Sequence, residues 1–97
     1  MSENNQKYYD AFRESIPKGS WATYKATIGN FLDGYKQDFA MVSPEEIIEF
    51  TGNKPNKNSH LRSMLIYMVS NDINNARKKM YKNTLIWLIA NTAKKCE

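Results

Sequence analysis

Apolar side chains recur along the chain at helical spacing, in segments separated by turn residues. The first segment spans Asn4–Ser15 and ends before Pro17-Lys18-Gly19. The second spans Ser20–Tyr35, and a serine at its start is a favourable N-cap because the hydroxyl accepts a backbone N–H. Its stripe follows the spacing of an amphipathic helix most closely and consists of Trp21, Tyr24, Ile28, Phe31, Leu32 and Tyr35.

A third, short helix is predicted by its capping residues. Ser43-Pro44-Glu45-Glu46 reads as a capping box with proline at the first helical position. Val42 and Ile47 are spaced to form a hydrophobic staple, and Gly52 is a natural residue after the helix end. The expected apolar face consists of Ile47, Ile48 and Phe50.

The rest of the chain predicts a polar loop over residues 53–58 and further helices after it. A fourth helix is expected to begin near Ser59, with a stripe of Leu61, Met64, Leu65, Met68 and Val69. Residues 73–95 form one long helix or two, with a basic first part and the apolar run Leu85–Ala90. A helix that is apolar on all sides is buried on all sides or contacts a partner.

These patterns predict an all-α fold, a small bundle of four to five helices, in a single domain over residues 1–97. The 97 residues leave no room for a second core, and no segment alternates with the period of a strand. No apolar run reaches the roughly 18 residues of a membrane span. The polar N-terminus lacks a secretion signal, and Cys96 has no second cysteine to pair with. We therefore expect a cytoplasmic protein without membrane contact.

Charge is distributed unevenly between the two halves of the sequence. Residues 1–52 carry five Lys/Arg against eight Asp/Glu, whereas residues 53–97 carry nine against two. A basic half-chain indicates an anionic partner, although a solvated basic face is the alternative.

Residues for catalysis or metal binding are scarce. His60 and Cys96 are the only histidine and cysteine, too few for a structural zinc site, and the four glycines form no phosphate-binding loop. Glu45, Glu46 and Glu49 are interpreted as a solvated helix face. We expect no enzyme activity, no metal, no cofactor and no small-molecule substrate.

The basic residues of the second half form a candidate DNA-binding set. An N-terminal helix turn offers backbone N–H groups and a positive dipole end to a phosphate, and we place Ser59 and Arg62 in such a turn. His60 is there either an exposed side chain or a phosphate or base contact. The candidate residues are Lys54, Lys57, Ser59, Arg62, Arg77, Lys78, Lys79 and Lys82.

Three segments in this order resemble the core-binding, SAM-like N-terminal domain of phage integrases and other tyrosine recombinases. Ser20–Leu32 looks like the opening helix of that domain, Val42–Phe50 is similar to its short helix, and Asn58–Val69 resembles the helix that follows a polar loop. The resemblance covers residues 17–82.

The resemblance implies an orthogonal helical bundle that grips double-stranded DNA, with Thr23 and Lys25 joining the contacts. The family's catalytic Arg…His-x-x-Arg…Tyr set is missing from the sequence. The chain is then either a domain excised from a recombinase or a stand-alone regulator from a phage or mobile element. The apolar C-terminal helix, residues 83–95, departs from the family pattern.

That C-terminal helix supports an alternative, a small phage accessory protein that binds another protein or a second copy of itself. Ile86, Trp87 and Ala90 point away from the face made by Leu85, Leu88 and Ile89, and Ala93 continues their line. Either they form a partner interface, or Trp87 folds back onto Tyr81 or the first helix.

Overall fold

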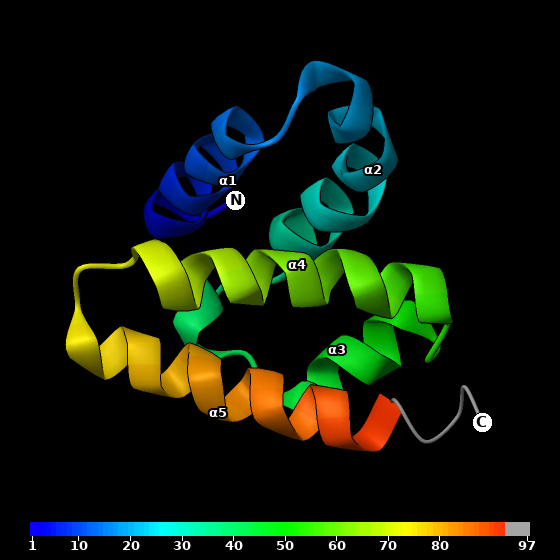
Figure 1. Cartoon of the computed structure of the whole chain (residues 1–97), viewed down its shortest axis with the longest axis vertical. Coiled ribbons are helices and arrows are strands. Elements are labelled where there is room, and N and C mark those ends of the chain that lie inside the picture. Colours follow the sequence, from blue (N-terminus) through cyan, green and yellow to red (C-terminus); the bar gives the residue numbers. More distant parts are fainter. Residues whose placement is uncertain (93–97) are drawn as a thin grey trace. The chain divides into compact units, whose positions relative to one another are not determined.

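The structure is a computed structural model that describes residues 1–92. Within this range the chain forms five α-helices, one 3₁₀ turn and no strand, which confirms the predicted all-α class. The helices, shown in Figure 1, are α1 (Glu3–Ser15), α2 (Lys18–Gly34), α3 (Pro44–Thr51), α4 (Pro55–Asn71) and α5 (Asn75–Thr92), and the 3₁₀ turn η1 is Phe39–Met41. No helix among the described residues is long and apolar enough to cross a membrane.

The chain divides into two compact units. Met1–Phe39 contains α1 and α2, and Ala40–Glu97 contains α3, α4 and α5. Each unit pairs helices that are neighbours in the sequence.

In the first unit, α1 packs against α2 through aromatic rings. Phe12 is buried and meets the rings of Trp21 and Tyr24 edge-on, at centroid distances of 6.3 and 6.0 Å. Tyr9 contacts Trp21 in the same geometry at 5.4 Å. Such edge-to-face pairs add to the stability that comes from area burial alone.

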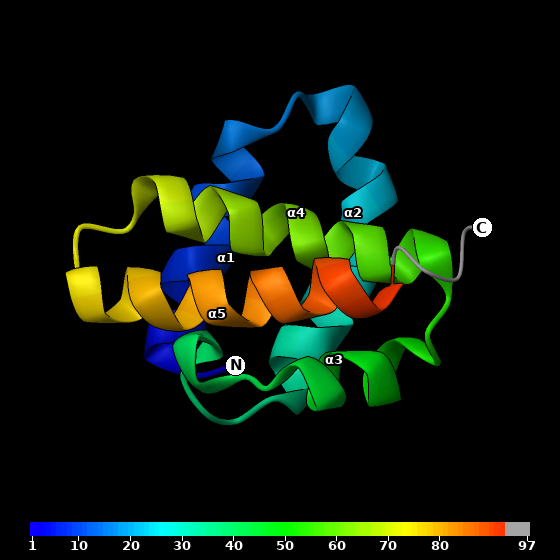
Figure 2. The same cartoon turned by 60° about the horizontal axis from the view of Figure 1, so that its bottom comes forward.

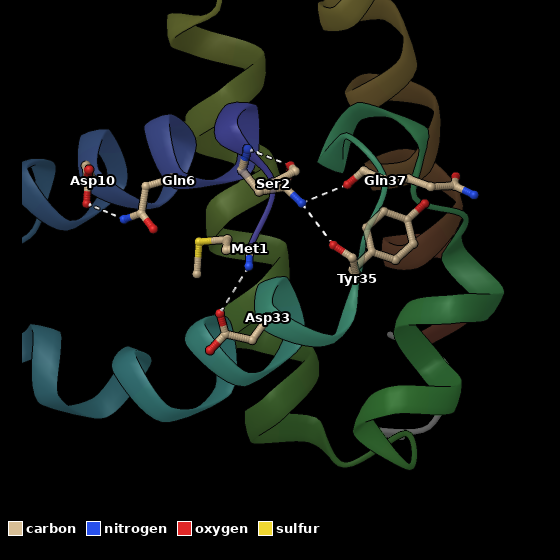
Figure 3. A network of polar contacts seen from close by, with 8 residues as sticks. Met1, Ser2, Gln6, Asp10, Asp33, Tyr35 and Gln37 are labelled. Carbon is tan, nitrogen blue, oxygen red and sulfur yellow. Dashed lines mark hydrogen bonds and ion pairs between the residues drawn. The ribbon is translucent and has the colours of Figure 1, made fainter.

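A buried asparagine closes the first unit. The Asn5 side chain is fully buried, and its Nδ2 donates to the carbonyl oxygens of Tyr35 (3.1 Å) and Gln37 (2.7 Å). Figure 3 shows these bonds as the dashed lines that end at the labelled residues Tyr35 and Gln37. Its Oδ1 accepts the backbone N–H of Phe39 at 2.8 Å. Asn5 therefore ties the start of α1 to the segment that follows α2.

In the second unit, α4 and α5 form an antiparallel hairpin joined by residues 72–74, and α3 packs against both helices (Figures 1 and 2). The Thr84 hydroxyl donates to the Val42 carbonyl at 3.2 Å and links α5 to the segment before α3. The buried apolar side chains of this unit include Ile47, Leu61, Met64, Leu65, Met68, Tyr81 and Leu88.

The α3 capping box is confirmed, but two other helix starts were predicted at the wrong residue. Ser43 and Glu46 form the reciprocal side-chain and backbone bonds, with Pro44 in the first turn. Ser20 does not cap α2, because the helix begins at Lys18 and the N–H groups of Ser20 and Trp21 bond to the Pro17 carbonyl.

The fourth helix begins at Pro55, one turn before the predicted Ser59. Proline fits the first helical position because its fixed φ suits the helix and its missing N–H would have no acceptor there. The loop is accordingly shorter than expected and contains two residues of positive φ, Gly52 (63°) and Asn53 (58°).

A buried side-chain network holds this loop. The Asn58 Nδ2 donates to Asn53 Oδ1 at 2.8 Å, and the Thr51 hydroxyl donates to Asn58 Oδ1. The sequence pattern treated Asn58 as a loop residue, whereas it lies in the first turn of α4 and is buried.

Residues 75–92 form one helix rather than two, and residues 93–95 of the predicted helix, with Ala93, lie outside the described part. Two residues of the predicted apolar faces are exposed, Phe50 on α3 and Ile89 on α5. Both lie at the edge of a narrow buried stripe, where the helical period leaves the side chain on the solvent side.

Candidate nucleic-acid interface

The predicted DNA-binding residues of the second unit lie along the α4–α5 hairpin. Lys54 and Lys57 flank the start of α4, whereas Arg77 to Lys82 occupy the first two turns of α5. Because the helices are antiparallel, these two groups lie toward opposite ends of the hairpin (Figure 1). A helix of 17 residues is about 25 Å long. The structure thus spreads the cations along the hairpin and does not gather them in one pocket.

Most of these cations have no ionic partner within residues 1–92. Among residues 1–92, none of the following six side chains takes part in an ion pair: Lys54, Lys57, Arg62, Lys78, Lys79 and Lys82. From Lys54 to Thr92 the sequence contains a single acidic residue, Asp72, which accepts the backbone N–H of Asn74 at 2.8 Å. The positive charge of the hairpin is therefore left to solvent or to an anionic partner.

The cations of α5 differ in exposure. Lys79 and Lys82 are exposed and lie three residues apart, so they share one face of the helix. Arg77 and Lys78 are half-buried, as is Arg62 on α4. Lys79 and Lys82 are consequently the α5 cations most accessible to a phosphate backbone.

The two helix N-termini of the hairpin are not equivalent. The start of α5 is capped, because Asn74 Oδ1 accepts the Arg77 N–H at 3.1 Å. The start of α4 has Lys54 at the N-cap position and no side-chain cap hydrogen bond. The first N–H groups of a helix lack intrahelical acceptors, so the α4 end offers donors to an anion beside Lys54 and Lys57.

Ser59 does not contribute to that end as predicted. It lies in the second turn of α4 and is half-buried, and its carbonyl accepts the Ser63 hydroxyl at 3.0 Å. Its own N–H is past the first turn of the helix. The sequence interpretation missed that Lys54 occupies the N-cap position of α4. The following proline, Pro55, could have indicated this position, because proline favours the first turn of a helix.

Thr23 and Lys25, taken from the family resemblance, lie on α2 in the first unit. Both are exposed. They are two residues apart and hence about 160° apart around the helix, so they face different directions. Lys25 borders an open groove between α1 and α2 that Tyr9, Gly29 and Asp33 also line.

His60 lies near the basic end of α4 and is half-buried. Burial lowers its pKa from the ordinary value of 6.5, because desolvation disfavours the charged imidazolium. The lowered pKa reduces the positive charge that the ring adds to this surface at neutral pH.

Among residues 1–92 no group of three or more His, Cys, Asp or Glu side chains could hold a metal ion, and Cys96 lies outside this range. Tyr81, the tyrosine nearest the α5 lysines in sequence, is buried with 1% exposure. Its place is in the core of the second unit.

Comparison of this chain with protein-family models, with curated proteins and with solved structures finds no match.

Proposed function

We propose that this chain is a non-catalytic, double-stranded DNA-binding domain of the integrase core-binding type. It acts within a recombinase or as a stand-alone phage or mobile-element regulator, in the cytoplasm. The observation that carries the proposal is the α4–α5 hairpin, on which six cationic side chains lack an ionic partner among the described residues.

The physical argument is counterion release. Duplex DNA holds condensed cations, and a protein that neutralises phosphates with Lys and Arg releases them. Cations already paired with carboxylates have less to gain from a phosphate. Lys79 and Lys82 are exposed and have no ion pair within the described part of the chain, so they are suited to this exchange.

A catalytic role on DNA is not part of the proposal. Tyrosine recombination needs a nucleophile beside cationic groups that stabilise the phosphoryl transition state. Tyr81 is flanked by lysines in the sequence, but its burial keeps it from a duplex phosphate. We expect no covalent DNA adduct at Tyr81.

The test is binding of the whole chain to a fluorescent mixed-sequence duplex at increasing salt. If about four to six phosphates are neutralised, log K should fall against log[salt] with a slope of about −4 to −5. No binding at about 50 mM salt, or binding independent of salt, would refute the proposal.

Charge-neutralising variants localise the contact. Lys79→Gln with Lys82→Gln should weaken binding and reduce the steepness of the salt slope by about 2, because each lost phosphate contact removes about one unit. Lys36→Gln, an exposed lysine of the first unit outside the predicted set, is the matched control and should change neither value appreciably. Arg62→Ala should cost about 1–3 kcal/mol if Arg62 reads a base edge, and less if it contacts only phosphate.

A second candidate function is a protein contact through α5, and the observation that favours it is exposed apolar surface. Ile86 and Trp87 are 55% and 37% exposed, and Ala90 is also exposed. Trp87 is more exposed than Tyr81, which is 1% exposed. A tryptophan folded into the core would be as buried as Tyr81. This function and DNA binding can reside in the same chain.

A further inference from the structure

The exposed face of α5 changes character along its length. Lys79, Lys82, Ile86 and Ala90 follow one another at steps of three or four residues, so they form one stripe on the helix. The first half of the stripe is cationic and the second half is apolar. Trp87 and Ile89, 37% and 42% exposed, widen the apolar half. We call the exposed residues Ile86, Trp87, Ile89 and Ala90 the α5 patch. Large contiguous apolar patches on a protein surface usually mark a contact surface.

The exposed face of α3 has the opposite charge and an apolar residue of its own. Glu45, Glu46 and Glu49 are exposed, and Phe50 is 41% exposed at the end of the helix. Glu46 and Phe50 are four residues apart, the same step that separates Lys82 from Ile86. A parallel pairing of the two faces therefore brings carboxylate to ammonium and Phe50 to the α5 patch in one register.

The charges on the two faces indicate which surface covers the α5 patch. A second α5 cannot supply it, since α5 contains no Asp or Glu and would only repeat the charges of Lys79 and Lys82. The α3 face of a second copy supplies both the carboxylates and an aromatic anchor. α3 and α5 contact each other within one unit. In a two-fold dimer each copy would contribute both helices, so the same α3–α5 contact would occur twice.

We propose that the chain forms a homodimer in which the α5 face of each copy packs on the α3 face of the other. The inference rests on the second candidate function, the protein contact through α5. It uses Lys79 and Lys82, the same lysines that are proposed to contact DNA, so the dimer and a DNA duplex would compete for these side chains.

Sedimentation of the full chain from about 5 to about 500 µM, without DNA, tests the dimer. The wild type should pass from monomer to dimer with concentration, and Trp87→Ala should weaken the association at least tenfold. If Trp87→Ala does not fold, Ile86→Ser serves instead, because that side chain is more than half exposed. A wild-type chain that stays monomeric throughout, or a dimer that neither substitution weakens, would overturn the proposal.

A charge swap tests which faces meet. Glu45→Lys with Glu49→Lys, and separately Lys79→Glu with Lys82→Glu, should each abolish the dimer, and an equimolar mixture of the two variants should restore a heterodimer. Glu46 is left intact because it completes the α3 capping box. Lys7→Glu, in the first unit, is the control and should dimerise as the wild type does. Failure of two folded variants to associate when mixed contradicts the pairing.

Thermal melting of the same variants separates the two ways to fail. If Ile86→Ser and Trp87→Ala melt at the same temperature as the wild type, and the wild type is a monomer, only the dimer is overturned. A large loss of stability in both variants means that the patch belongs to the fold, which overturns the second candidate function as well. If the monomer floats with phosphatidylserine-containing vesicles, the α5 patch binds a lipid surface and not a second copy. That result would also overturn the dimer.

Discussion

Asn5 connects the start of α1 to the segment after α2 in the first unit. Its amide makes three hydrogen bonds to backbone groups of residues 35–39 and is fully buried. Asn5→Ala removes all three and leaves backbone groups without partners. The free energy of unfolding, measured by urea titration followed by circular dichroism, should fall by about 2–4 kcal/mol.

Asn4→Ala is the matched control for that substitution. Asn4 is half-buried and donates one hydrogen bond to Asp38 Oδ2, at 2.9 Å. Its loss should cost about 1 kcal/mol or less. Equal effects of the two substitutions would contradict the role given to Asn5.

His60 predicts a dependence of stability on pH. Its pKa is lowered by burial, so the unfolded chain binds a proton more readily than the folded chain as the pH falls below 6.5. The His60 contribution should therefore reduce stability on acidification through this range and fade as the pH rises above it. His60→Gln should flatten the difference between urea titrations at about pH 7.5 and about pH 5. A stability that rises on acidification only when His60 is present would reverse the sign and contradict the prediction.

At the scale of the element, Gly29 is a site where α2 can be strengthened. It lies inside the helix, and an added Cβ would lie 3.6 Å from Tyr9 Cε2, an ordinary van der Waals contact. Gly29→Ala should therefore raise the free energy of unfolding by about 0.5–1 kcal/mol, because alanine loses less backbone entropy in a helix.

Gly52→Ala is the opposite case and the control. Gly52 ends α3 with φ of +63°, where a Cβ is strained although the surrounding space is open. It should cost about 1–2 kcal/mol. A stabilising Gly52→Ala would show that the α3 end does not need this conformation.

The sequence predicted helices well where caps and stripes agreed, and less well where two signals competed. Ser43 and Glu46 specify the start of α3 through their own hydrogen bonds, and that start was predicted correctly. For α4, Pro55 and Ser59 are both plausible starts. The earlier one holds although Lys54 makes no side-chain cap bond, because proline already suits the first turn.

The exposed and buried sides of the helices were harder to predict than the helices themselves. Period alone places Phe50 and Ile89 near an apolar stripe, but burial depends on which neighbouring helix covers each edge. The buried amides of Asn5 and Asn58 were missed for a related reason. Their partners are backbone or side-chain groups of other segments, and a polar residue in a sequence does not reveal such partners.

At the scale of the whole molecule, the charge imbalance predicts a response to salt. Residues 1–39 carry five Lys/Arg and five Asp/Glu, whereas residues 40–92 carry seven against four. Repulsion among the cations of α4 and α5 should weaken as salt screens it. Raising NaCl from about 20 to about 300 mM should therefore raise the melting temperature, which differential scanning fluorimetry can follow.

The control for this effect is Lys79→Gln with Lys82→Gln, in which the rise should be smaller. A melting temperature that falls with salt would mean that attractive pairs outweigh repulsion. The sequence showed that the second half is basic, but it could not show that the cations lie toward opposite ends of a hairpin. That arrangement follows from the antiparallel packing of α4 and α5 (Figure 2).

The bond between Phe39 and Asn5 makes one backbone amide a reporter on the opening of the first unit. The Phe39 N–H is hydrogen-bonded to a side chain of α1 and not to a helical carbonyl. It can therefore exchange with deuterium only when α1 separates from the segment after α2. The Tyr35 N–H, bonded to the Phe31 carbonyl at 2.9 Å, instead exchanges when the end of α2 frays. Comparing the protection of these two amides separates detachment of α1 from local fraying of α2, because exchange resolves openings of different free energy within one native structure.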